Sequence, residues 1–340
     1  MGTAEDAIST RRPVITEEWP QVKLTIAIPS YRRPDDLRRA LEAVAAQNHP
    51  ADEIIVVVRQ DDRETQSVVR EFSSTLPVML ELVERPGMVE AVNRALDRAT
   101  GEIVALTDDD AAPHADWTER MLATYQSEPD LAGLGGRDHI RQSDGRWEDG
   151  EATVVGIVRW YGHLLGYHHL GIGTRRDVDC LKGVNMSFRR SALGPLRMDR
   201  RLRGTGAQCH CDLKLCLEVR ARGLRLAYDP AMVVDHFPAP RFDEDQRGAF
   251  NRTAYENEIH NITLALLDYL SPAGRMLLIP YALLIGIANG YCGLLKGLLI
   301  WPRIGVRRAV EKNLTSIRGV CMAWRTWRAT GNRIQTAVLG

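Results

Sequence analysis

Short apolar runs alternate with amphipathic stretches along the first third of the chain. The runs are almost wholly apolar, as strands buried on both faces of a sheet are. Four of them are predicted strands: residues 22–28, 54–58, 78–83 and 103–106. In the segments between them apolar residues recur at helical spacing, as in the helix expected after an Asp35 N-cap, with Leu37, Leu41 and Val44 on one face. Strands alternating with helices predict a doubly wound, mostly parallel α/β sheet.

The fourth apolar run ends on three consecutive carboxylates, Asp108, Asp109 and Asp110. Adjacent anions repel one another unless a cation neutralises them, and ligands of open α/β sheets bind at the carboxyl ends of the strands. Oxygen ligands suit Mg²⁺ or Mn²⁺, which commonly carries substrate phosphates. A solvated Asp-rich turn is the alternative, but the buried strand before the triplet favours a metal site.

The turn after the first predicted strand lacks the glycines that bring a phosphate close to the backbone. Residues 29–34 are Pro-Ser-Tyr-Arg-Arg-Pro, which is no dinucleotide fingerprint, and the chain has no P-loop. Phosphates are therefore expected to be held by a metal and by cationic side chains.

Composition excludes one large class of partner and indicates a compartment. The 340 residues carry 44 Lys and Arg against 44 Asp and Glu, a balance that argues against nucleic-acid binding. The six cysteines do not form the spacing of a disulfide framework, so a reduced, cytoplasmic setting is expected. Residues 1–12 are polar and lack an apolar signal core, and residues 1–20 are expected to be a loose leader.

Four motifs in order carry a family resemblance that covers residues 22–236. Residues 24–34 (Leu-Thr-Ile-Ala-Ile-Pro-Ser-Tyr-Arg-Arg-Pro) and residues 100–110, preceded by Gly87 and an Asn-Arg-Ala-Leu run, are the first two. The others are residues 180–190, with Gly-Val-Asn-Met-Ser-Phe-Arg-Arg, and residues 211–236. In this order the motifs resemble those of family 2 glycosyltransferases, which have the GT-A fold. The resemblance implies an α/β fold with a doubly wound, mostly parallel sheet like that of nucleotide-diphospho-sugar transferases. The resemblance places the Asp triplet at the family's DXD motif.

The resemblance implies a nucleotide-sugar donor whose diphosphate sits on a divalent metal, Mn²⁺ or Mg²⁺. The metal is expected on Asp108, Asp110 and His236, although His236 could equally be a hydrogen-bonded histidine at a strand end. The donor-binding residues are expected to be Pro29, Tyr31, Arg33, Asp61, Asp62, Asn93, Asp108, Asp109 and Lys182. Either Asp61 or Asp62 would hold the nucleotide base, which is left open among uridine, guanosine and thymidine.

Asp212 matches the family's catalytic base in an inverting reaction. A carboxylate that takes the proton of an acceptor hydroxyl during attack makes that hydroxyl a better nucleophile. The start of a helix also stabilises Asp212 as an anion. The chain departs from the family pattern at Cys211, where a glutamate is usual, so one expected carboxylate is missing.

On the acceptor side, Asp138, Asn185 and Trp160 are candidates for contacts with the acceptor. Trp160 belongs to an aromatic, His-rich stretch at residues 160–169 that suits sugar stacking or ordinary packing. A zinc site on residues 209–216 is disfavoured, because no second pair of ligands accompanies Cys209, His210, Cys211 and Cys216.

The predicted units are a catalytic domain at 21–240, with a nucleotide-sugar half (21–130) and an acceptor half (131–240), and a helical, partly hydrophobic extension at 241–340. Residues 276–295 carry no charge and are long enough to span a bilayer, yet Pro280 and several glycines interrupt them. A basic segment follows. One span cannot leave both flanks on the cytoplasmic side, so an interfacial helical hairpin is favoured over a span or a buried subdomain.

The sequence therefore predicts an inverting, metal-dependent glycosyltransferase of polysaccharide biosynthesis at the cytoplasmic face of a membrane. It would transfer a sugar from a UDP, GDP or TDP donor to a hydroxyl of a glycan or lipid-linked acceptor. One alternative is a nucleotidyltransferase, whose usual glycine-rich first loop is missing here. The other is a degenerate carbohydrate- or nucleotide-binding relative without turnover, which Cys211 would suit.

Overall fold

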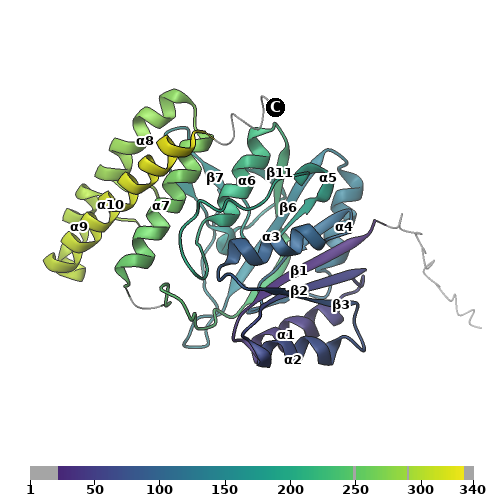
Figure 1. Ribbon diagram of the computed structural model, residues 1–340. Helices are drawn as coiled ribbons and strands as arrows, with labels where there is room; N and C mark the ends of the chain where they lie inside the picture. The colour runs from purple at the N-terminus through teal and green to yellow at the C-terminus, as the bar shows by residue number, and fades with distance from the viewer. Residues whose placement is uncertain (1–21, 248–249, 289–290, 333–340) are drawn as a thin grey trace, which may run out of the picture.

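The computed structural model describes residues 22–247, 250–288 and 291–332, so the predicted leader lies outside the described residues. A nine-stranded mixed sheet forms its centre, in the order β3-β2-β1-β4-β10-β6-β11-β5, with β9 paired to β11 (Figure 1). The strands are β1 (Leu24–Ser30), β2 (Glu53–Arg59), β3 (Val78–Val83), β4 (Ile103–Leu106), β5 (Ala111–Pro113), β6 (Leu131–Ile140), β9 (Arg176–Val178), β10 (Met186–Arg189) and β11 (Arg225–His236). The four predicted strands are all present.

The sheet is parallel in the first half of the chain and mixed in the second. β1 pairs in parallel with β2 and β4, and β2 with β3. β10 then runs antiparallel between β4 and β6. The predicted α/β class is confirmed, and the carboxyl ends of β1, β2 and β4 meet at one edge of the sheet.

Alternation along the strands divides the apolar core into two layers. Ile26 and Ile28 of β1 face the cluster formed with α1 (Pro34–Ala45), α2 (Arg63–Phe72) and α4 (Trp117–Ser127). Ala27, between them, faces the cluster that includes α3 (Met88–Arg98) and α6 (Cys211–Ala221). Strands covered by helices on both faces explain why the sequence runs were continuously apolar.

The first helix corrects one detail of the prediction. Arg33, and not Asp35, is its N-cap residue, and Pro34 occupies the start of the helix. Proline suits that position because its fixed φ is helical and it has no N–H to satisfy. Asp35 and Asp36 instead lie in the first turn, where anions are favourable.

Short elements connect β6 to the second half of the sheet. A two-stranded ribbon pairs β7 (Ile157–Val158) with β8 (Leu164–Leu165), and a 3-10 turn η1 (His168–Leu170) follows. The short helix α5 (Arg190–Leu193) continues directly from β10.

Four helices form a separate layer at the side of the sheet (Figure 1). They are α7 (Arg252–Tyr269), α8 (Pro272–Leu284), α9 (Leu294–Ile304) and α10 (Val306–Thr330). The uncharged stretch 276–295 ends α8 and opens α9, with a turn between these helices. Among the described residues, none of the helices combines the length and apolar character needed to cross a bilayer.

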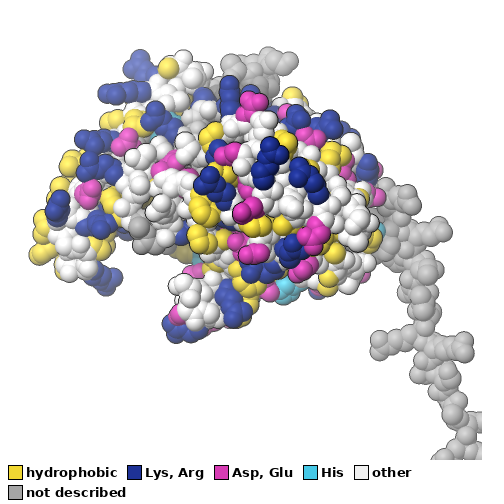
Figure 2. All heavy atoms as spheres, turned by 60° about the horizontal axis from the view of Figure 1, so that its bottom comes forward, with side chains coloured by type: hydrophobic (Ala, Val, Ile, Leu, Met, Phe, Trp, Pro, Cys, Tyr) yellow, Lys and Arg dark blue, Asp and Glu magenta, His cyan; other side chains and the backbone are white. Residues whose placement is uncertain are grey.

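The helical layer buries one side and exposes apolar residues on the other. Ile262, Leu264 and Leu266 of α7 are fully buried. Met276 of α8 and Leu299 of α9, by contrast, are each 78% exposed. Figure 2 shows hydrophobic side chains interspersed with basic ones along the left side of the molecule, which is the side of these helices.

Candidate functional site

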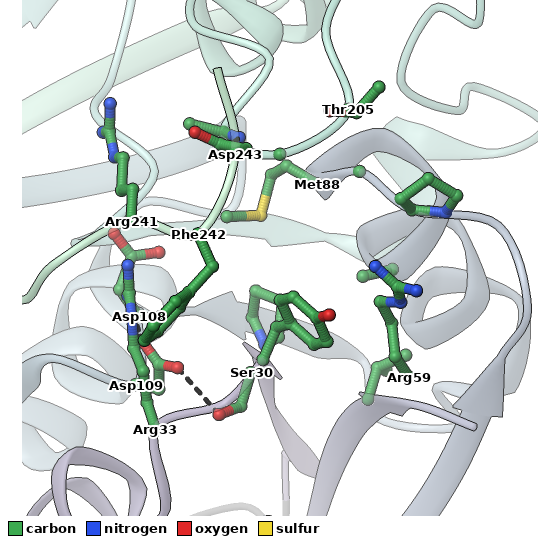
Figure 3. A pocket seen from close by; sticks show the side chains of 18 of the residues that line it. Ser30, Arg33, Arg59, Met88, Asp108, Asp109, Thr205, Arg241, Phe242 and Asp243 are labelled. Atoms are coloured by element: carbon green, nitrogen blue, oxygen red, sulfur yellow. Dashed lines mark hydrogen bonds and ion pairs between the residues drawn. The ribbon is translucent and has the colours of Figure 1, made fainter. Parts of the chain in front are cut away.

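A cavity of about 300 Å³ opens where β1, β2 and β4 end. Asp108, Asp109 and Arg33 lie on one side of the cavity together with Phe242, and Arg59 lies on the opposite side (Figure 3). The predicted donor residues Pro29 and Tyr31 also line it. The carboxyl edge of the sheet thus forms a cavity with both acidic and cationic side chains.

Asp109 is fixed within the protein. Its carboxylate accepts a hydrogen bond of 2.7 Å from the Ser30 hydroxyl and one of 2.8 Å from Arg33. Burial raises the pKa of Asp109 to about 7, even though the Arg33 charge opposes this shift. The middle carboxylate of the triplet therefore anchors the turn on which Asp108 and Asp110 are presented.

Asp108, Asp110 and His236 form the group with the chemistry of a metal site. Each offers one ligand atom, and these atoms lie within 4.8 Å of one another. Asp110 is 1% exposed, and its Oδ1 is buried without a hydrogen-bond partner, as are both ring nitrogens of His236. Buried polar atoms are normally hydrogen-bonded, so ligand atoms that lack a hydrogen bond fit a divalent cation such as Mn²⁺.

A row of charges leads from this group to Lys182. His236 Nε2 is 3.4 Å from Asp110 Oδ1, and its Nδ1 is 3.6 Å from Asp138 Oδ2. Lys182 contacts the buried Asp138 carboxylate. Burial opposes the shift, but the two carboxylates raise the pKa of His236, and Lys182 together with His236 lowers the pKa of Asp138.

Asp212 lies in the first turn of α6, next to this row. Its carboxylate accepts hydrogen bonds of 3.0 Å from the Gly183 N–H and 2.7 Å from the Leu213 N–H. Gly183 directly follows Lys182, whose ammonium group contacts Asp138, and Asp138 in turn faces His236. The candidate base is therefore linked to the metal group through these few contacts. Cys211 is the first residue of α6 and is buried in the apolar core, and His210, the N-cap residue of this helix, has a left-handed conformation with φ 71°.

Two predicted donor carboxylates lie outside the lining of the cavity. Asp61 pairs with Arg59 at 2.9 Å. Asp62 caps α2 and accepts hydrogen bonds from the Thr65 and Arg32 N–H groups. The lining residue at this end of β2 is Arg59, whose guanidinium lies 4.4 Å from the Tyr31 ring centroid.

Two predicted asparagines have their amides bonded inside the protein. Asn93 donates to the Met198 carbonyl at 3.0 Å and accepts from its N–H at 2.7 Å. Asn185 is fully buried, accepts from the Trp117 indole at 2.8 Å and donates to two carbonyls. Trp160 is 63% exposed and packs edge-on against Tyr161, away from the cavity lining.

Residues 237–247, which sequence reasoning left unassigned, close one side of the cavity. Arg247 donates to Asp110 Oδ2 at 2.9 Å, and the Ala239 N–H bonds the same oxygen at 2.9 Å. Arg33 donates to the Pro240 carbonyl at 2.9 Å. The only sequence signal was the mixture of arginines, acids and prolines directly after His236.

The cysteine cluster considered for zinc does not come together. Cys209 lies beside Asp245 and Glu258, while Cys211 and Cys216 are buried in the core. Arg241 already contacts the Asp245 carboxylate, which leaves little unbalanced negative charge for a metal.

Comparison with known families identifies the family of the chain. A model described as "Glycosyltransferase like family 2" matches residues 20–252. The chain belongs to this family. The match begins before β1 and ends at the first residue of α7, so it includes the Asp triplet, Asp212 and His236.

Curated relatives of this family 2 chain match over part of their length. A glucosyl-dolichyl phosphate glucuronosyltransferase of Haloferax volcanii is 29% identical over 117 residues, covering 34% of this chain and 37% of the relative. The succinoglycan biosynthesis protein ExoM of Rhizobium meliloti is 32% identical over 130 residues, covering 36% and 42%. The matched parts thus span about two fifths of these relatives.

Solved structures share the fold at low identity. Residues 1–349 of S. aureus TarS in complex with UDP-GlcNAc superpose with a TM-score of 0.55 at 15% identity, covering 89% of this chain and 91% of that one. GalNAc-T7 with UDP, GalNAc and Mn²⁺ gives 0.55 at 13% identity, covering 72% and 47%. These likenesses confirm the predicted GT-A type sheet.

Proposed function

We propose that the protein is a metal-dependent, inverting glycosyltransferase that uses a nucleotide-diphosphate sugar. The observation that carries the proposal is the group of Asp108, Asp110 and His236, whose ligand atoms lie within 4.8 Å of one another beside a cavity at the carboxyl edge of the sheet, and which includes buried atoms without a hydrogen bond. Family membership supports the reaction class, and solved structures that share the fold hold UDP or a UDP-sugar. A nucleotidyltransferase has no comparable support.

In the proposed reaction the acceptor oxygen attacks the anomeric carbon as the bond to the diphosphate breaks. Asp212 takes the proton of the attacking hydroxyl, and its bonds from two backbone N–H groups hold the carboxylate in place. Asp108, Asp110 and His236 would hold the metal, which offsets the charge that grows on the leaving diphosphate. Arg33 and Arg59 supply further positive charge in the cavity.

Tyr31 and Arg59 are the proposed contacts of the nucleotide. The Tyr31 ring lies between the Arg59 guanidinium and Phe242, whose ring centroid is 6.4 Å away edge-on. Aromatic and guanidinium planes suit stacking on a nucleobase. Among the predicted carboxylates, Asp62 is already used as a helix cap, so Asp61 is the better placed of the two to approach the base.

We also propose the division into a catalytic unit at 21–240, with halves at 21–130 and 131–240, and an extension at 241–340 that lies on the cytoplasmic face of a membrane. Exposed apolar residues form a stripe along α10 at helical spacing: Val306, Val310, Leu314, Ile317 and Trp324. Exposed Arg307, Arg318 and Arg325 flank this stripe about a quarter turn away. Such a basic, amphipathic helix suits the surface of anionic lipids.

Calorimetric titration with UDP, GDP and TDP, with and without Mn²⁺, tests the donor site. One nucleotide is expected to bind in the presence of Mn²⁺, and Asp110→Ala is expected to abolish this binding. Asp97→Ala is the control, because Asp97 is an exposed aspartate paired with Arg197. Failure of all three nucleotides to bind under either condition would overturn the proposal.

Asp212→Asn separates the enzyme from a degenerate binding protein. The amide keeps the shape of the side chain but cannot accept the proton, so transfer is expected to fall by about 10²- to 10⁴-fold while nucleotide binding persists. Transfer to saccharide acceptors that is unchanged in this variant would remove Asp212 from the mechanism.

A further inference from the structure

A second, larger cavity lies next to the donor cavity and has no role so far. Its volume is about 610 Å³, and it lies among the β8–η1 region, residues 245–247 and 250–251, α7 and α10. Arg247 lines both cavities, so the two are neighbours. A group bound in the second cavity would therefore reach toward the bound donor.

Aromatic rings form much of the wall of the second cavity. They belong to Tyr167, Phe250, Tyr255 and Tyr291. Phe250 and Tyr255 have ring centroids 5.5 Å apart, and Tyr255 and Tyr291 are 5.9 Å apart. Apolar faces with a few polar groups at fixed positions are typical of a small-molecule site.

The end of this cavity toward the catalytic residues is rich in groups that bind hydroxyls. His210, which starts α6 two residues before Asp212, bonds the Tyr291 hydroxyl, and Glu258 also lines the wall. These groups suit a saccharide, whose hydroxyls both donate and accept.

The opposite end is cationic. Lys312 of α10 lies 5.6 Å from the Phe250 ring centroid and 5.3 Å from that of Tyr255, while Arg308 lies 5.0 Å from Phe250. No acidic side chain among the described residues forms an ion pair with Lys312 within 4.0 Å. Burial lowers the pKa of Lys296 in the first turn of α9, and the Lys312 charge lowers it further.

We infer that this second cavity binds the acceptor as a saccharide joined through phosphate to a lipid, with the saccharide against the aromatic wall and the phosphate at Lys312. A compact ammonium group is a common phosphate ligand. The lipid chain would pack on exposed apolar side chains of α9, because Leu294, Leu295 and Leu298, near Lys296, are all exposed. The inference rests on the proposed function and names its acceptor class.

The test is calorimetric titration of the full chain with geranyl phosphate, a short lipid phosphate, and with geraniol, its uncharged counterpart. The wild-type protein is expected to bind geranyl phosphate at least tenfold more tightly than geraniol. Lys312→Met is expected to remove this difference, and Lys312→Arg to restore most of it. Arg200→Met, at the exposed pair with Glu90 and outside the cavity lining, is the control and is expected to keep the difference.

Two further measurements make the outcomes distinct. Glucuronate tests whether any anionic sugar suffices, and tight binding of glucuronate that depends on Lys312 would overturn the assignment to a lipid phosphate. Nucleotide titration of the same variants reports the donor site separately. If the protein binds nucleotide but its affinity for geranyl phosphate is the same with and without the Lys312 ammonium group, this inference alone is overturned. If the wild-type protein does not bind nucleotide, the proposed function is overturned.

Discussion

Two clusters of buried charge hold this molecule together in different ways. One lies where α6 meets α7: Lys214 is fully buried, 2.9 Å from Asp268 Oδ2, and also contacts Glu218. Arg201 contacts Asp268 and Asp199 in the same cluster. The other is the donor cluster, in which Asp108, Asp109 and Asp110 meet Arg33, Arg247 and His236.

The clusters differ in whether the residues whose polar atoms lack a hydrogen bond line a cavity. Asp268 and Glu218 each keep one unpaired oxygen, but neither residue lines either of the cavities described above. In the donor cluster both nitrogens of His236 and Oδ1 of Asp110 have no hydrogen bond and only longer charge contacts of 3.4 and 3.6 Å, and Asp110 lines a cavity. Buried charge by itself therefore does not mark a site, whereas unpaired ligand atoms at a cavity do.

Asp108→Asn should separate activity from stability most strongly. Burial and repulsion from Asp110 raise the pKa of Asp108, so its charged form is disfavoured by folding, and an amide should relieve that cost. Transfer is expected to fall by about 10³-fold as a charged ligand is lost. The melting temperature is expected to stay the same or to rise by a few degrees. Steady-state transfer and calorimetric melting measure the two effects.

A fall in both quantities would show that the Asp108 charge supports the fold, as the charges near Lys214 do. The control is Asp97→Asn, on the exposed pair with Arg197, which should change neither.

Lys214→Met should produce the opposite pattern. Removing the ammonium group leaves the buried Glu218 carboxylate without its cation and Asp268 with Arg201 alone, and breaking a buried ion pair typically costs about 3–5 kcal/mol. Denaturant unfolding should show this loss of stability, while the fraction that stays folded should keep its nucleotide affinity. Arg38→Met, at the exposed Arg38–Glu71 pair, is the control and should leave the unfolding midpoint in place. Equal midpoints for the two variants would mean that the cluster contributes no stability.

Much of the fold and part of the site could be predicted from the sequence, because both depend on local patterns. Apolar runs defined the strands of the parallel half, and the polar triplet at the end of one run marked the sheet edge. The family motifs located His236, which the structure places within 4.8 Å of Asp108 and Asp110. Alternating strands and helices form a parallel sheet whose strand ends meet at one edge, so the local pattern is enough to predict where these features lie.

Features that depend on pairing between distant segments could not be predicted. Arg247 reaches Asp110 across 137 positions in the sequence, from a segment with no periodic pattern. Asn93 matched a motif, yet both its amide atoms bond Met198, 105 positions away. Lys214 lies on α6, whose sequence pattern gives no sign of its contact with Asp268 on α7, 54 positions away.

Arg247→Gln should have the smallest effect and tests what its contact with Asp110 does. In the structure its guanidinium takes one of the two oxygens of a proposed metal ligand, at 2.9 Å. A cation at that place competes with a metal for the same carboxylate, so the variant should bind Mn²⁺ alone about tenfold more tightly, which corresponds to about 1.4 kcal/mol. Nucleotide binding at saturating Mn²⁺ is expected to weaken at the same time if the guanidinium turns to the diphosphate once the metal displaces it. Calorimetry with Mn²⁺ alone, and then with nucleotide, separates the two roles, and Arg39→Gln, on the α1 surface and outside the cavity lining, controls for loss of positive charge. Weaker binding of Mn²⁺ alone would show that Arg247 orders the metal ligands instead of competing for them.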